Sequence, residues 1–200
     1  MPYQEKKQTE IITVLGQRGS GKSSWIQKAL PDIPRFVLWD TLGEYGQYKL
    51  FTEVKTKQEL FDYVWDHNDG VMQVVYNSVD DEDFGFVCSL CENLEDLTFI
   101  IEEVDNYATP NLCPIDLKRL LKYGRHSGLS MIFVSRRPAE INRLITSQSQ
   151  RFICFTIIEP TDVRYLTSII GPVAKVLPTL KKLEFVDWNP DRIKRGEIKW

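Results

Sequence analysis

The chain contains a glycine-rich segment whose residue types and spacing suit phosphate binding. Residues 16–23 read Gly-Gln-Arg-Gly-Ser-Gly-Lys-Ser, which fits the pattern G-x-x-x-x-G-K-[ST] at each fixed position. In such a loop the backbone N–H groups point inward at phosphate oxygens, and the N-terminus of the following helix adds its positive dipole end. Lys22 is expected to reach the β- and γ-phosphates, and the Ser23 hydroxyl to ligate Mg²⁺. The motif therefore predicts a site for ATP and magnesium.

The segments on either side of the loop have the pattern that this motif requires. The apolar run IITVL precedes the loop, and SSWIQKAL, which has a helical pattern, follows it. The structural alternative is a glycine-rich turn that happens to precede a helix, and the presence of motif and context together argues against it. The expected nucleotide-binding residues are Gly16, Gln17, Arg18, Gly19, Ser20, Gly21, Lys22, Ser23 and Ser24.

Two adjacent glutamates supply the carboxylates that such a site needs. Residues 97–105 read LTFIIEEVD, an apolar strand that ends in acids. Ligands of open α/β sheets bind outside the carboxyl ends of the strands, so Glu102 is expected on the magnesium side and Glu103 beside the attacking water. Glutamate replaces the more usual aspartate at the first position, which leaves open how Glu102, Glu103 and Asp105 divide these roles. The alternative is that these acids cap a loop and remain in solvent.

Short β-branched and aromatic runs alternate with amphipathic segments along the chain. This alternation predicts an α/β fold with a mainly parallel sheet flanked by helices. Strands are expected over residues 11–15, 36–39, 71–76, 98–101, 131–135 and 152–157. Helices are expected over residues 22–30, 57–67, 81–94, 114–126, 138–146 and 161–170. A β-rich tail, over residues 183–186 and 197–199, is expected to form an edge ribbon or an oligomer contact.

Size and composition indicate one domain. A chain of 200 residues with 42% hydrophobic content can bury a full core, which we expect over about residues 10–170, with a C-terminal β extension over about 171–200. The N-terminus shows no signal peptide and no apolar run approaches the roughly 20 residues of a membrane span, so we expect a cytoplasmic protein without an intrinsic span. The net charge of −3 argues against a protein that coats nucleic acid with its whole surface, but not against a ring that contacts DNA through a few loops.

Cysteine and histidine usage does not predict a protein-only metal site. Cys88 and Cys91 have metal-ligand spacing, but they fall in a predicted helix and no second pair follows at a workable distance. Buried, structural cysteines are the better interpretation. His67 and His126 are the two histidines of the chain, which makes a histidine-based metal or acid–base site improbable.

Four segments in a fixed order resemble a particular group of P-loop proteins. They are residues 40–45 (DTLGEY), the paired acids Glu102 and Glu103, residues 122–128 (KYGRHSG) and residues 131–138 (MIFVSRRP). Together they resemble the FtsK/HerA group of DNA-pumping ATPases, and within it the genome-packaging ATPases of tailless, membrane-containing viruses. The resemblance covers most of residues 11–170.

The resemblance implies a RecA/FtsK-HerA-like P-loop fold and a homo-oligomeric ring. Such a ring, a hexamer by analogy, would hold ATP at its subunit interfaces and double-stranded DNA in its centre. Arg125 is then the candidate trans-acting arginine finger, with Arg136 and Arg137 as second choices; the alternative for Arg125 is a solvated arginine at a helix end. Arg136 also stands where the family has a γ-phosphate-sensing glutamine, so that role is lost, moved to Ser135 or performed by a cation.

These observations favour an ATP-driven translocase of double-stranded DNA, of the kind that packages a viral genome. Its further partner would be a capsid or membrane-vertex protein, and its location the host cytoplasm or the virion. A small-molecule or nucleotide kinase is one alternative, although no arginine-rich lid is visible between the strands. A nucleotide-regulated assembly ATPase, such as a morphogenesis or secretion factor, is the other.

Overall fold

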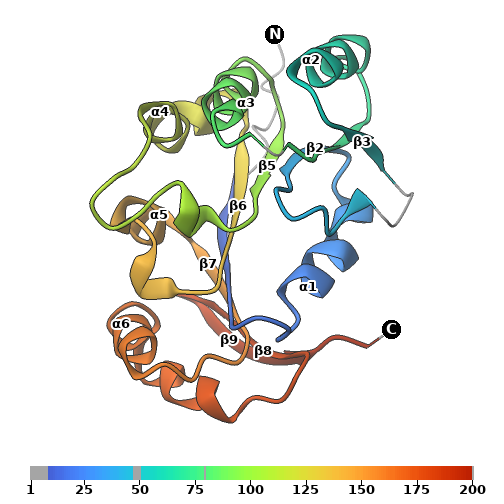
Figure 1. The fold of residues 1–200 in the computed structure, drawn as a ribbon. Coiled ribbons are helices and arrows are strands. Elements are labelled where there is room, and N and C mark those ends of the chain that lie inside the picture. Colours follow the sequence, from blue (N-terminus) through green and yellow to red (C-terminus); the bar gives the residue numbers. More distant parts are fainter. Residues whose placement is uncertain (1–8, 47–50, 79, 200) are drawn as a thin grey trace, which may run out of the picture.

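The computed structural model describes residues 9–46, 51–78 and 80–199, whose strands form one sheet (Figure 1). The strand order is β3-β4-β2-β5-β6-β1-β7-β8-β9. The strands are β1 (Ile11–Leu15), β2 (Arg35–Trp39), β3 (Thr52–Val54), β4 (Met72–Tyr76), β5 (Thr98–Ile101), β6 (Ser130–Ser135), β7 (Arg151–Cys154), β8 (Glu184–Asn189) and β9 (Arg192–Glu197). Neighbouring strands from β3 to β7 pair in parallel, and β8 and β9 pair antiparallel. The predicted, mainly parallel α/β sheet is confirmed.

Helices lie on both faces of this sheet (Figure 1). They are α1 (Lys22–Ala29), α2 (Lys57–Asp66), α3 (Asp83–Glu92), α4 (Ile115–Tyr123), α5 (Arg143–Gln148) and α6 (Pro160–Ile170). Short 3₁₀ helices span Leu30–Asp32, Val104–Asn106, Gly124–Ser127, Pro138–Glu140 and Gly171–Thr179. Helix α1 packs on one face, whereas α3, α4 and α6 pack on the other, so the sheet is the middle layer.

Alternation along the central strands builds a separate hydrophobic cluster on each face. Leu38 of β2 and Ile26 of α1 belong to the cluster on one face, whereas Val37 of β2 and Val87 of α3 belong to the cluster on the opposite face. These side chains are fully buried. Burial on both faces explains why the strands read as continuous apolar runs rather than as alternating ones.

Several element boundaries differ from those that the sequence predicts. Residues 138–146 form a 3₁₀ turn followed by α5, because the Asn142 side chain accepts a hydrogen bond from the N–H of Leu144 and starts a new helix. The short strand β3 and the 3₁₀ helix Gly171–Thr179 were not predicted. The C-terminal ribbon is an edge hairpin, as expected, but its second strand is Arg192–Glu197 rather than residues 197–199, because the turn at Pro190 and Asp191 sets its register.

This topology brings the chemically interesting residues to one edge of the sheet. Strands β2, β5, β6 and β1 are neighbours and parallel, so the segments that follow them leave the sheet on the same side. Within the described ranges, none of the helices combines the length and the apolar content that crossing a bilayer requires.

Candidate active site

The glycine-rich loop joins β1 to α1 and has the backbone shape that its glycines permit. Gly19 and Gly21 have φ angles of 73° and 127°, which side-chain-bearing residues rarely adopt. A Cβ atom on Gly21 would also come within 2.9 Å of the Phe155 ring. Helix α1 begins directly after the loop at Lys22, so its N-terminus faces the loop's interior. The predicted strand–loop–helix unit is therefore confirmed.

The Lys22 side chain folds back over the loop. Its Nζ atom lies 2.9 Å from the carbonyl oxygen of Gly16, and the residue is 7% exposed. Burial lowers the pKa of this ammonium group, and the nearby carboxylates of Glu102 and Glu103 partly oppose that shift. A buried cation at the mouth of the loop is placed to attract phosphate oxygens.

Glu102 directly follows β5 and points into the interior beside the loop. It is 4% exposed, and Oε1 accepts a hydrogen bond from the Tyr45 hydroxyl. Burial raises the pKa of this carboxyl to about 8, although the hydrogen bond from Tyr45 and the charge of Lys22 both lower it. The group is thus largely protonated at neutral pH in this structure.

The loop after β2 supplies Glu44 and Tyr45, which form hydrogen bonds with Ser23 and Glu102. The buried Asp40 carboxylate accepts hydrogen bonds from the backbone N–H groups of Tyr45, at 2.9 Å, and Leu42, at 3.3 Å, which fixes the turn. Burial raises the pKa of Asp40. The turn places Glu44 against the phosphate loop, where its Oε2 accepts a 2.5 Å hydrogen bond from the Ser23 hydroxyl. Residues 40–45 are thereby hydrogen-bonded to both groups expected on the magnesium side, to Ser23 through Glu44 and to Glu102 through Tyr45.

Glu103 is held by an arginine from the neighbouring strand. Its backbone is left-handed, with φ 48° and ψ 45°, so its side chain leaves the strand in a different direction from that of Glu102. The Arg136 guanidinium, just after β6, donates a hydrogen bond from Nε to Glu103 Oε2 at 2.8 Å, and its Nη2 atom forms an ion pair with the same oxygen at 2.7 Å. The pairing raises the pKa of Arg136. The carboxylate expected to orient water is therefore fixed by the cation that replaces the expected glutamine.

These groups line one cleft of about 560 Å³, a size that suits a nucleotide. The lining residues are Arg18, Gly19, Gly21, Lys22, Ser23, Ser24, Leu42, Glu44, Glu102, Glu103, Arg136, Lys182 and Leu183. In the part of the chain that the structure describes, no cluster of three or more His, Cys, Asp or Glu residues could hold a metal without help. A hydroxyl from Ser23 and a carboxyl from Glu102 nevertheless fit Mg²⁺, which proteins commonly bind through one or two such groups together with substrate phosphates.

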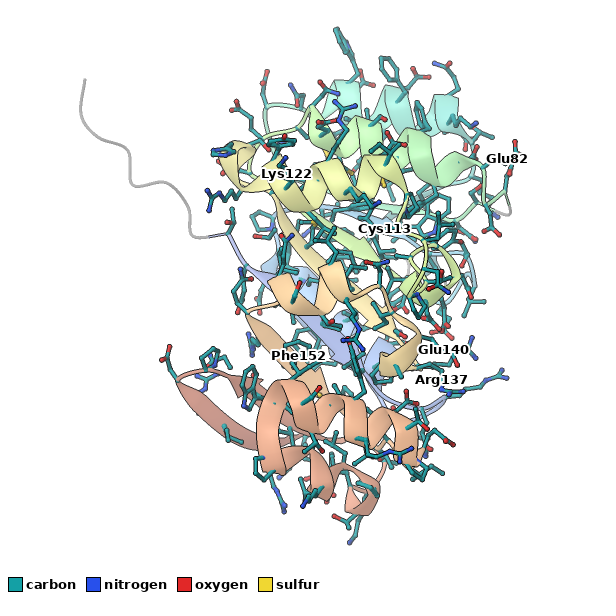
Figure 2. All side chains as sticks on the ribbon, turned by 90° about the vertical axis from the view of Figure 1, so that its left-hand side faces the viewer. Glu82, Cys113, Lys122, Arg137, Glu140 and Phe152 are labelled. Atoms are coloured by element: carbon teal, nitrogen blue, oxygen red, sulfur yellow. The ribbon has the colours of Figure 1, made fainter. Side chains whose placement is uncertain are left out.

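The three candidate arginines lie in different places. Arg125 is exposed in the 3₁₀ turn after α4 and lines a separate cleft with Ile11 and Met131, the paired residues at the amino ends of β1 and β6. Figure 2 shows the end of α4, marked by Lys122, far from Arg137, which follows the carboxyl end of β6. Arg125 therefore lies at the opposite edge of the sheet from the phosphate loop of its own chain.

Arg137, beside the site, is engaged in structural contacts. Its Nε atom lies 2.9 Å from Asp162 on α6, and its Nη2 atom lies 3.1 Å from Glu140, which Figure 2 shows next to it. Asp105 is outside the cleft lining, and its Oδ1 is buried without a hydrogen-bond partner among the described residues. Of the expected site residues, the structure thus brings the loop, Glu102 and Glu103 together with Arg136, but not with Arg125.

Sequence reasoning missed some of the cleft's contributors. Glu44 and Tyr45 belong to the DTLGEY segment, whose resemblance to known proteins was a signal that they could lie near the site. Lys182 and Leu183 come from the C-terminal extension, and their sequence carries no motif that indicates a role at the phosphate loop.

Solved structures of viral packaging enzymes share this architecture. The genome packaging NTPase B204 from Sulfolobus turreted icosahedral virus 2, in complex with AMP, matches with a TM-score of 0.77 at 19% identity, over 96% of this chain and 98% of that chain. The DNA-packaging ATPase B204 from Sulfolobus turreted icosahedral virus matches with a TM-score of 0.73 at 19% identity, over 95% and 98%. This chain has a P-loop NTPase fold.

Proteins of other systems also match the chain. VirB4 of Thermoanaerobacter pseudethanolicus matches with a TM-score of 0.70 at 11% identity, over 99% of this chain and 91% of that chain. Among curated sequences, "Probable helicase MJECL08" of Methanocaldococcus jannaschii is 39% identical over 70 residues, which span 34% of this chain and 14% of that protein. No family model matches the chain. At the level of the fold, the predicted resemblance to genome-packaging ATPases is confirmed.

Proposed function

We propose that the chain is a magnesium-dependent ATPase whose cleft holds and hydrolyses ATP. The observation that supports this most directly is the convergence of Lys22, Glu102 and Glu103 on one phosphate loop. A kinase site and an ATPase site can share both the loop and a carboxylate base, so what distinguishes them is the phosphate acceptor, a small molecule or water. Magnesium, when bound, would neutralise charge on the phosphates and leave them open to attack.

The cleft residues nearest the phosphate loop have roles that follow from their positions. Lys22 would hold the β- and γ-phosphates, and the Ser23 hydroxyl would turn from Glu44 toward the metal. Glu102 would lose its proton as the metal's positive charge arrives, since that charge favours the carboxylate. Glu103 would accept a proton from the attacking water while Arg136 fixes its carboxylate.

We further propose that ATP hydrolysis drives double-stranded DNA through a homo-oligomeric ring, a hexamer by analogy with related motors. The similarity to viral packaging enzymes supports this role. Arg125 lies away from its own cleft, so in a ring it would act on the cleft of a neighbouring copy. Genome packaging would place the protein in the host cytoplasm or the virion, beside a capsid or membrane-vertex protein.

Turnover measurements separate this proposal from its alternatives. Purified chain should release phosphate from ATP in a magnesium-dependent reaction that double-stranded DNA accelerates, and its mass should rise to that of a ring when ATP and DNA are present. Transfer of phosphate to a small acceptor would indicate a kinase instead. Hydrolysis that DNA leaves unchanged would contradict the translocase and favour an assembly ATPase.

A further inference from the structure

The C-terminal extension reaches the phosphate loop and is bonded to it. The backbone N–H of Leu183 donates to the carbonyl oxygen of Ser20 at 2.8 Å. One step further back, the Thr156 hydroxyl donates to Leu180 O at 2.9 Å, while the N–H of Gln17 donates to Thr156 O at 2.9 Å. The turn before β8 is therefore attached to both arms of the loop.

Leu183 has an unusual conformation at the point of contact. Its φ angle of 71° is left-handed, which is uncommon for a bulky residue and is typically maintained by surrounding contacts. Its carbonyl oxygen accepts a hydrogen bond from the N–H of Ile198 at 3.0 Å, so both backbone polar groups of Leu183 are hydrogen-bonded. A Cβ on Gly21 would meet the Leu183 side chain at 3.0 Å, which places that side chain against the loop. Lys182 and Leu183 consequently line the nucleotide cleft.

The sheet order shows which end of a nucleotide this turn faces. Glu102 follows β5 and Arg136 follows β6, and both strands lie on one side of β1. The Leu183 turn leads into β8, which lies beyond β7 on the other side of β1 (Figure 1). A triphosphate whose γ-phosphate meets the carboxylates must extend its nucleoside toward the opposite side. Lys182 and Leu183 of this turn are among the described residues that line the cleft.

We propose that Lys182 and Leu183 form the nucleoside end of the ATP site, a binding role that rests on the proposed ATPase function. Lys182 supplies a cation for the α-phosphate, the one phosphate that AMP, ADP and ATP share. Leu183 supplies an apolar surface against the ribose and base. Because the same turn leads into β8, a bound nucleotide would contact the segment that directly precedes the C-terminal hairpin.

A comparison of three nucleotides tests this assignment, with dissociation constants obtained by competition against a fluorescent ADP analogue. Lys182→Ala should weaken the binding of AMP, ADP and ATP by a similar factor of about tenfold, since each complex loses one charge-assisted hydrogen bond. Lys181→Ala is the matched control, because Lys181 is the adjacent exposed lysine and is not part of the cleft lining; it should stay within about twofold of wild type. Lys22→Ala should weaken the binding of ATP and ADP far more than the binding of AMP.

The outcomes separate the two proposals. If Lys182→Ala binds each nucleotide with the same affinity as wild type, the nucleoside-end assignment is overturned. A loss of affinity confined to ATP would also overturn it, because that result would place Lys182 at the γ-phosphate. A wild-type chain that binds none of the three nucleotides would overturn the ATPase proposal itself. A wild type that binds them, with Lys22→Ala impaired and Lys182→Ala normal, would leave the ATPase proposal intact and reject the role of the turn.

Discussion

Replacing Glu102 by glutamine should stabilise the protein at alkaline pH although it damages the active site. Burial raises the pKa of this carboxyl from 4.5 to about 8, so between these values the folded chain keeps a proton that the unfolded chain has released. Unfolding then releases a proton, and the stability contributed by neutral Glu102, fully present below pH 4.5, is lost as pH rises toward about 8. Glutamine does not titrate, and its oxygen can still accept the bond from Tyr45.

The size of the effect follows from the width of this interval. Three and a half pH units at about 1.4 kcal/mol each lower the free energy of unfolding of the wild type by about 5 kcal/mol. Glu102 is 4% exposed, so little solvent screens its charge. The stability of Glu102→Gln relative to wild type should therefore grow by about 5 kcal/mol between pH 4.5 and pH 8, and level off above it.

Urea unfolding at pH 5, 6, 7 and 8, without nucleotide or magnesium, measures this difference directly. The matched control is Glu95→Gln, at an exposed glutamate, whose stability relative to wild type should change little over the same range. A difference between Glu102→Gln and wild type that stays constant from pH 5 to pH 8 would refute the inference that Glu102 is buried in its neutral form.

Substitutions at three positions probe the remaining chemistry of the cleft. Lys22→Ala should lower ATP turnover by about 10²–10³, because it removes the cation that follows the phosphates into the transition state; wild-type turnover would mean that the phosphate site is misplaced. Glu103→Gln should slow hydrolysis by at least about 10² while ATP binding, measured by calorimetry, is retained. Arg136→Ala should slow turnover by about tenfold or more because Glu103 loses its anchor, and Arg136→Gln should recover part of the loss; equal turnover in all three proteins would remove Arg136 from the mechanism.

The phosphate loop and the central strands could be predicted from sequence because their signals are local. The loop motif specifies its own turn, and strands buried on both faces read as uninterrupted apolar runs. Glu102 and Glu103 were placed correctly at the end of β5, because a strand end fixes the position of the next residue.

Contacts between distant segments were not predictable in the same way. The pairing of Glu103 with Arg136 depends on β5 and β6 being neighbours, which no local pattern encodes. The approach of Lys182 and Leu183 to the loop depends on a 3₁₀ segment of nine residues and on a left-handed leucine, and sequence propensity predicts neither.

Mixing two inactive variants tests most directly whether a second copy completes each ATPase site. Arg125→Ala should bind ATP with near-normal affinity yet hydrolyse it at least about 10³-fold more slowly, as expected for a trans-acting arginine. When Arg125→Ala is mixed with Glu103→Gln, rings of mixed composition should regain turnover, because some interfaces then combine an intact Glu103 with an intact Arg125 from the neighbour. No recovery in rings whose mixed composition is verified by mass would contradict a trans-acting Arg125.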